Sequence, residues 1–125
     1  MRDENNGAVR QVLLAVSDQR VRSALRAFLI ANPLVESITE AYGLDSALAL
    51  ARERTPTIAV VDVHLPTRNE GLSLIRRLSR DFAVPVVSIG MESGARRSAL
   101  QAGAIRFLEK ARVVDDLFDA LHALG

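Results

Sequence analysis

The sequence contains no cysteine, no tryptophan and only one lysine among its 125 residues. Without cysteine, the chain has neither a disulfide framework nor a cysteine-based metal site. No apolar run approaches the roughly 20 residues that a membrane-spanning helix needs, and residues 1–7 lack the apolar core of a signal peptide. We therefore expect a soluble, cytoplasmic protein that has no membrane partner.

The composition favours one globular domain. Apolar residues make up 49% of the chain, too many for a disordered protein, and 125 residues can bury one hydrophobic core. Sixteen basic and fifteen acidic residues give a net charge of +1, which argues neither for nor against nucleic-acid binding. Residues 1–8 are mostly polar and are expected to form a flexible lead, with the domain spanning residues 9–125.

Short apolar segments alternate with segments whose apolar residues recur at helical spacing. The apolar segments have the length and β-branched content of strands, and all but the second are too uniformly apolar to have one face in water. Asp45 and Ser46 are candidate caps of the second helix, and Gly103 follows the fourth. Alternation of this kind predicts an α/β domain with one doubly wound parallel sheet. The five predicted strands are residues 11–16, 34–41, 58–61, 84–89 and 105–108.

Candidate functional residues follow three of these strands. In an open parallel sheet, reactive groups gather beyond the carboxyl ends of the strands. Asp18 follows the first strand, Asp62 ends the third, and Lys110 follows the fifth. A carboxylate at the end of an apolar strand costs free energy unless a cation accompanies it, and the lone lysine offers a compact charge that suits a phosphoryl oxygen. We expect the two carboxylates and the ammonium to meet in one crevice.

Each of these residues also has a simpler interpretation. Asp62 is equally consistent with a cap of the turn that follows its strand, and Ser17 or Asp18 with the N-cap of the first helix. A lysine taken alone is usually a solvated surface residue. Residues 17–20 contain no glycine, which argues against a dinucleotide-binding loop.

Together these segments resemble the receiver domain of two-component response regulators. The resemblance covers nearly the whole chain, and the order and spacing of its short motifs are more specific than any motif alone. It implies a flavodoxin-like sheet of five parallel strands in the order 2-1-3-4-5. The motifs are residues 12–18, Asp62 with Pro66 four residues later, residues 84–87, and the stretch from Gly103 through Phe107 to Lys110.

The resemblance also implies a role for each site residue. Asp62 would accept a phosphoryl group from a sensor histidine kinase, as a carboxylate nucleophile that forms an acyl phosphate, and Lys110 would pair with that group. Asp18, Asp62 and the main-chain carbonyl of His64 would bind Mg²⁺. Phe107 stands where the family has a rotating aromatic switch. The domain is not expected to be an enzyme, beyond phosphorylating and dephosphorylating its own aspartate.

The chain departs from the family pattern in the loop between Pro66 and Gly71, which is one residue longer than usual, and at Ala111, which replaces a frequent proline. Two further departures affect the chemistry of the site. Ser17 replaces a second acidic residue, which weakens the expected Mg²⁺ site. Gly90 replaces a serine or threonine whose hydroxyl bonds the phosphoryl group, and Ser88, on the same face of the strand, is a distant candidate substitute. These departures support an alternative, a degenerate receiver that acts by phosphorylation-independent protein contacts. A flavin-binding or other small-ligand protein of the same architecture is a third interpretation.

The partners implied by the resemblance are a sensor histidine kinase and a C-terminal output domain outside this chain, often DNA-binding and active in transcription regulation. The fourth helix, fifth strand and fifth helix carry charges of both signs, which suits a symmetric homodimer or, equally, ordinary solvated helix ends. The charged residues of this face are Arg96, Arg97, Arg106, Arg112, Asp115, Asp116 and Asp119.

Overall fold

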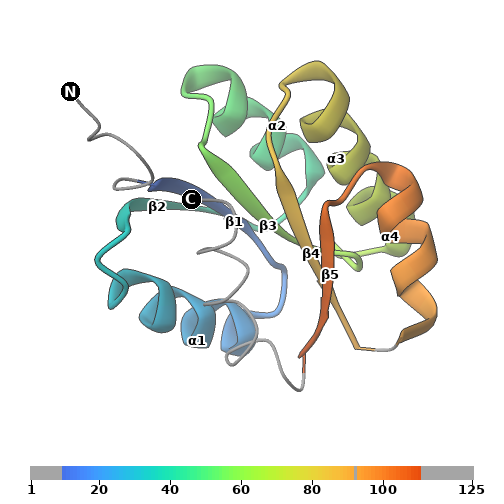
Figure 1. The fold of residues 1–125 in the computed structure, drawn as a ribbon, viewed down its shortest axis with the longest axis horizontal. Helices are drawn as coiled ribbons and strands as arrows, with labels where there is room; N and C mark the ends of the chain where they lie inside the picture. Colours follow the sequence, from blue (N-terminus) through green and yellow to red (C-terminus); the bar gives the residue numbers. More distant parts are fainter. Residues whose placement is uncertain (1–9, 92, 111–125) are drawn as a thin grey trace.

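The computed structural model describes residues 10–91 and 93–110. Within them, five parallel strands form one sheet in the order β2-β1-β3-β4-β5 (Figure 1), which confirms the predicted fold class and strand order. The strands are β1 (Arg10–Ala15), β2 (Val35–Ala41), β3 (Ile58–Asp62), β4 (Val86–Gly90) and β5 (Arg106–Glu109). The predicted N-terminal lead and fifth helix lie outside the described residues.

Helices cover both faces of the sheet (Figure 1). The helices are α1 (Gln19–Ile30), α2 (Leu44–Glu53), α3 (Arg68–Asp81) and α4 (Arg96–Ala102), with a short 3₁₀ helix η1 (Ser93–Ala95) before α4. Helices α2, α3 and α4 pack on one face, and α1 packs on the other. The architecture is therefore doubly wound, as expected.

The hydrophobic core consists of two clusters, one on each side of the sheet. Leu13 and Val61 belong to the cluster beneath α2, α3 and α4, whereas their neighbours Leu14 and Val60 belong to the cluster beneath α1. This division follows from the strand geometry, because successive side chains point to opposite faces. All residues of β3 and β4 are buried, which explains why these segments are apolar almost throughout.

Two glycines mark the ends of helices. Gly43 is the N-cap of α2 and makes no side-chain cap, so the prediction that Asp45 or Ser46 caps this helix is wrong. The Ser46 hydroxyl instead donates to the carbonyl of Gly43 at 3.2 Å from within the first turn. Gly103 ends α4 with φ at 119°, in the left-handed region that glycine adopts without a steric cost.

Helix α3 packs very closely on the loop that follows β3. A Cβ atom at Gly71 would lie 1.8 Å from the carbonyl oxygen of Val63 and 2.7 Å from that of Asp62. No side chain fits there without a movement of the backbone. The glycine therefore lets α3 support the loop that begins at Asp62.

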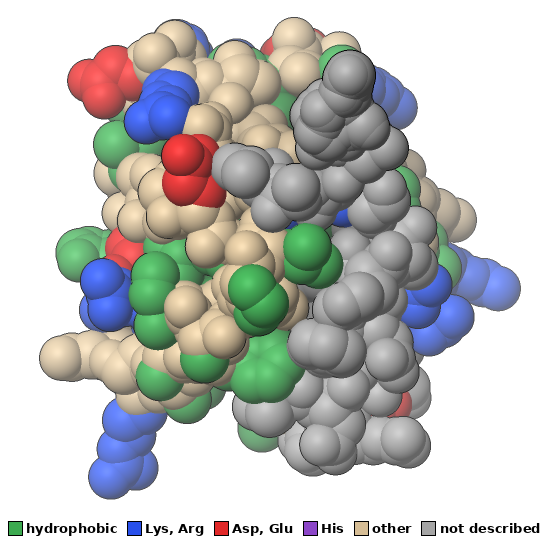
Figure 2. Space-filling model, turned by 60° about the vertical axis from the view of Figure 1, so that its left-hand side comes forward, with side chains coloured by type: hydrophobic (Ala, Val, Ile, Leu, Met, Phe, Trp, Pro, Cys, Tyr) green, Lys and Arg blue, Asp and Glu red, His purple; other side chains and the backbone are tan. Residues whose placement is uncertain are grey.

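The described surface carries charges of both signs and a few exposed apolar side chains. On the face shown in Figure 2, hydrophobic side chains lie next to polar atoms, and charged side chains stand mostly near the outline. Tyr42 is 60% exposed and Met91 is 70% exposed. None of the helices in the described part of the chain is long and apolar enough to cross a membrane.

Candidate functional site

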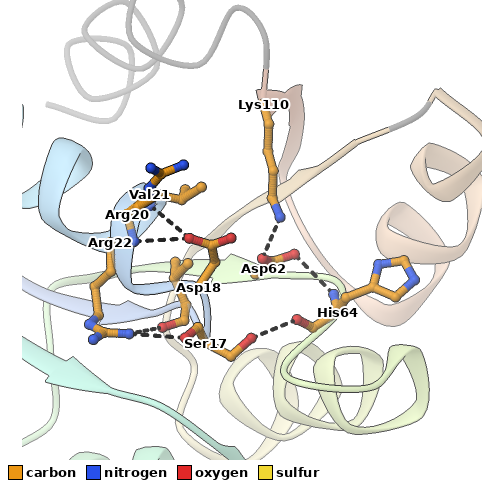
Figure 3. A network of polar contacts seen from close by, with 9 residues as sticks. Ser17, Asp18, Arg20, Val21, Arg22, Asp62, His64 and Lys110 are labelled. Carbon is orange, nitrogen blue, oxygen red and sulfur yellow. Dashed lines mark hydrogen bonds and ion pairs between the residues drawn. The ribbon is translucent and has the colours of Figure 1, made fainter.

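Asp62 and Lys110 form an ion pair at the C-terminal edge of the sheet (Figure 3). Asp62 is only 1% exposed, and its Oδ2 lies 2.7 Å from Nζ of Lys110. The other oxygen, Oδ1, accepts a hydrogen bond from the backbone N–H of His64 at 3.0 Å. The Asp62 side chain therefore caps the turn after β3 and also pairs with Lys110, the only lysine of the chain. The ammonium compensates for the burial of the carboxylate.

Asp18 faces the same space from the start of α1 (Figure 3). Its Oδ1 accepts hydrogen bonds from the backbone N–H groups of Arg20 at 2.9 Å and Val21 at 3.1 Å, so Asp18 is also the N-cap of α1. The Val21 hydrogen bond, together with that of Arg20 and the charges of Lys110 and Arg20, lowers the pKa of Asp18 against a smaller effect of desolvation. Asp18 is therefore an exposed, ionised carboxylate at neutral pH.

Ser17 and His64 lie beside the two carboxylates. The Ser17 hydroxyl donates to the main-chain carbonyl of His64 at 3.4 Å. The imidazole of His64 is exposed and points away from Asp62 (Figure 3). His64 thus offers main-chain atoms to the site, and its carbonyl already has a partner in the residue that replaces the expected second acid.

The oxygen atoms at this edge of the sheet are of the chemical type that binds a hard divalent cation. The carboxylates of Asp18 and Asp62 and the carbonyl of His64 are the type of ligand that Mg²⁺ prefers. Within residues 10–91 and 93–110, no three His, Cys, Asp or Glu side chains come together as a metal-binding group. A cation here would therefore depend on the main-chain oxygen and on water for its remaining ligands.

The ring of Phe107 fills the space beside Gly90. A Cβ atom at Gly90 would lie 2.8 Å from Cε1 and 2.9 Å from Cζ of this ring, which is buried with 6% exposure. The hydroxyl of Ser88 donates to the carbonyl of Arg106 at 3.3 Å, inside the sheet. Ser88 therefore does not supply the hydroxyl that Gly90 lacks.

Two arginines near the site were missed by the sequence analysis. Arg22 donates from Nη1 to the carbonyls of Val16 at 2.8 Å and Ser17 at 3.2 Å, directly before Asp18. Arg68 borders a cavity of about 170 Å³ together with His64, and its Nη2 donates to Oγ of Ser98 in α4 at 2.8 Å. Since fifteen of the sixteen basic residues are arginine, neither position carries a distinctive signal in the sequence.

The family comparison decides between the interpretations of the fold. A family model described as the response regulator receiver domain matches residues 12–122. The chain belongs to this family. The match favours a receiver over the alternative of a flavin-binding protein with the same architecture.

Solved structures of receiver domains resemble this receiver domain closely. A two-component response regulator of the LuxR family from Aurantimonas sp. SI85-9A1 has a TM-score of 0.82 and 27% identity, over 93% of this chain and 84% of that one. The receiver domain of NtrX from Brucella abortus has a TM-score of 0.81 and 26% identity, over 90% and 96% of the two chains.

The chain matches part of the length of two longer curated relatives. A protein-glutamate methylesterase/protein-glutamine glutaminase from Anaeromyxobacter dehalogenans is 32% identical over 90% of this chain and 34% of its own length. The transcriptional regulatory protein LiaR from Bacillus subtilis is 28% identical over 90% of this chain and 54% of its own length. This receiver domain thus spans about a third to a half of these relatives, whose names describe two different outputs.

Proposed function

We propose that this receiver domain accepts a phosphoryl group on Asp62 from a sensor histidine kinase and thereby changes the binding of a partner or output domain. The observation that carries the proposal is the ion pair between the nearly buried carboxylate of Asp62 and Lys110, 2.7 Å apart. A carboxylate oxygen bonds to phosphorus as the bond between phosphorus and the histidine nitrogen breaks, and the electron pair stays on the imidazole. Lys110 then pairs with the phosphoryl oxygens.

The same residues would hold the cation that this chemistry uses. Asp18, Asp62 and the carbonyl of His64 would hold Mg²⁺, which when bound neutralises charge on the phosphoryl oxygens. Ser17 donates a hydrogen bond to the carbonyl of His64, and it brings no negative charge. We expect Mg²⁺ to bind more weakly than in a site with a third carboxylate.

The family also suggests in which compartment this domain acts and on what kind of output domain. We expect a cytoplasmic domain without catalytic activity beyond modification of its own aspartate, acting on an output domain, often DNA-binding in this family, that regulates transcription. Arg96, Arg97 and Arg106 are exposed on α4 and β5, as a homodimer through this face requires. The other four charged residues of the expected dimer face lie outside the described residues.

Mass spectrometry of the intact domain tests the proposal. After incubation with Mg²⁺ and a small acyl phosphate, we expect the wild type to gain the mass of one phosphoryl group and Asp62→Asn to gain none. Asp81→Asn is the matched control, because Asp81 is exposed at the end of α3 and should not affect the reaction. An unmodified wild type, or a phosphorylated Asp62→Asn variant, would contradict the proposal.

A second function is favoured by the packing of Phe107 on Gly90. Without a hydroxyl at this position, the phosphoryl group loses a hydrogen bond worth about 1.5–3 kcal/mol, and the ring already occupies the adjacent space. A receiver of this kind would bind its partner through protein contacts alone. Equal partner affinity for the phosphorylated wild type and for Asp62→Asn would support this function over the first.

A further inference from the structure

Arg22 holds the loop that carries Asp18 and Ser17. We propose that Arg22 is a positioning residue of the acidic site, which fixes the peptide groups on both sides of Asp18 and thereby the directions of the Asp18 carboxylate and the Ser17 hydroxyl. What the site binds rests on the proposed function, whereas the contacts of Arg22 are observed independently of that function.

Arg22 donates hydrogen bonds to three successive main-chain carbonyl oxygens. Its backbone N–H donates to the carbonyl of Asp18 at 2.9 Å, as the first hydrogen bond of α1. Its Nη1 donates to the carbonyls of Val16 at 2.8 Å and Ser17 at 3.2 Å. Hydrogen bonds from a charged donor are stronger than neutral ones. One residue therefore restrains three successive peptide groups between β1 and α1, those whose carbonyls belong to Val16, Ser17 and Asp18.

The guanidinium of Arg22 is itself held in place. The side chain is only 11% exposed, and its Nε lies 3.2 Å from Oε1 of Glu40 in β2. The guanidinium carbon lies 4.1 Å from the centre of the Tyr42 ring, within the range of a cation–π contact. A planar guanidinium can make all these contacts at once because its donors point in fixed, divergent directions, whereas a lysine ammonium cannot. Arg22 therefore ties the site loop to the end of the neighbouring strand.

These restraints determine what the site presents to a cation or a phosphoryl group. The Asp18 carboxylate keeps one oxygen on the amides of Arg20 and Val21, and the Ser17 hydroxyl reaches the carbonyl of His64. The guanidinium of Arg22 is engaged by Glu40 and by main-chain carbonyls, and so it is directed at these partners and not at the carboxylates of the site. Without Arg22, two of the three carbonyls would turn to water and the loop would lose its fixed shape.

A comparison of three variants tests this role. Arg22→Met removes the contacts, Arg22→Lys keeps the charge without the planar fork, and Arg26→Met is the control. Arg26 lies one turn further along α1, is 51% exposed and pairs with the same Glu40 at 2.9 Å. For each variant, we would measure Mg²⁺ affinity by NMR titration and the hydrogen exchange of the Arg20 and Val21 amides, with global stability in parallel.

We expect Arg22→Met to weaken Mg²⁺ binding by about tenfold, the size typical of residues that orient metal ligands. Exchange of the two amides should accelerate, Arg22→Lys should restore part of both losses, and Arg26→Met should match the wild type. A folded Arg22→Met variant with wild-type affinity and exchange would overturn the proposal. So would equal losses in Arg26→Met, because they would assign the effect to the charge of Glu40.

Two further outcomes are decided by the same measurements. A wild type that binds no Mg²⁺ would count against the proposed function, while amide exchange in Arg22→Met would still support or overturn the positioning role. If Arg22→Met does not fold, Tyr42→Leu replaces it, because this substitution on the surface removes the aromatic support of the guanidinium. Exchange at Arg20 and Val21 must then rise in Tyr42→Leu, and unchanged exchange would overturn the proposal.

Discussion

The buried carboxylate of Asp62 is paired with the ammonium of Lys110. Asp62 is 1% exposed, and the Lys110 ammonium, itself 16% exposed, lies 2.7 Å from it. We expect Lys110→Met to lower the free energy of unfolding by about 3 kcal/mol, because it leaves a charge buried without a partner. The double variant Asp62→Asn/Lys110→Met should lose less free energy of unfolding than Lys110→Met alone, because it no longer buries an unpaired charge. Urea denaturation at pH 7 measures both.

The control for this prediction is an exposed ion pair of the same kind. Arg77 and Asp81 are 2.6 Å apart on α3, with side chains 43% and 52% exposed. Because water and salt screen such a pair, Arg77→Met should cost less than about 1 kcal/mol. If Lys110→Met and Arg77→Met lower the free energy of unfolding equally, the buried ion pair contributes no more to stability than the exposed one, which would contradict the prediction.

The ring of Phe107 occupies the space that a side chain at Gly90 would need. A Cβ atom at Gly90 would come within 2.8 Å of the Phe107 ring, so Gly90→Thr must displace the ring or the strand. We expect Gly90→Thr to lower the free energy of unfolding by about 1–3 kcal/mol. Phe107→Leu makes room, so the double variant should lose less than the sum of the single variants. Strictly additive losses in thermal or urea denaturation would contradict this interpretation.

The sequence predicts the charged residues of the candidate site better than the residues that support them. Asp62 and Lys110 can be found because a carboxylate ends an apolar strand and because the chain has one lysine. Arg22 cannot be found in this way, since its role depends on a side chain that folds back over the loop. The sequence also shows that Gly90 lacks a hydroxyl, but only the structure shows that the ring of Phe107, a residue paired with Ser88 in the sheet, fills the space beside Gly90.

Helix α3 packs against the loop that follows Asp62 because Gly71 has no side chain at the point of contact. Replacement of a helical glycine by alanine normally stabilises a helix by about 0.5–1 kcal/mol. We expect Gly71→Ala to destabilise the domain instead, because a Cβ atom would lie 1.8 Å from the carbonyl oxygen of Val63. NMR spectra should show shifts of the Asp62 and Val63 amides. Gly94→Ala is the control, since a Cβ atom there meets nothing within 4 Å, and a similar loss in both variants would contradict the prediction.

The sequence predicts the elements themselves more reliably than their ends. The β-branched apolar runs identify all five strands, yet the fourth was expected to begin at Val84 and begins at Val86. Val84 lies before the strand, where its N–H donates to the carbonyl of Leu78 in α3 at 2.9 Å, and its side chain is buried in the core beneath α2, α3 and α4. Burial alone gives the same sequence pattern as a strand, so periodicity cannot separate the two.

At the scale of the whole molecule, the site is connected to α4 by a route that bypasses Phe107. Arg68, the first residue of α3, donates to Oγ of Ser98 in α4 at 2.8 Å. It borders the same cavity as His64, which follows Asp62 by two residues. A phosphoryl group on Asp62 would add negative charge two residues before His64, which lines the same cavity as this guanidinium. We therefore expect a change at Asp62 to alter α4 through the hydrogen bond between Arg68 and Ser98.

This connection predicts where phosphorylation changes the dynamics of the domain. Hydrogen exchange before and after treatment with the acyl phosphate should change in α4 and in the loop after Asp62. Exchange around Phe107 should stay the same, because the ring is already packed on Gly90. Asp62→Asn should show no change, and Arg68→Met should lose the change in α4 while it retains the mass of the phosphoryl group. If α4 exchanges at the same rate in the phosphorylated and untreated wild type, the charge on Asp62 does not reach this surface, and binding independent of phosphorylation becomes the better account of the domain.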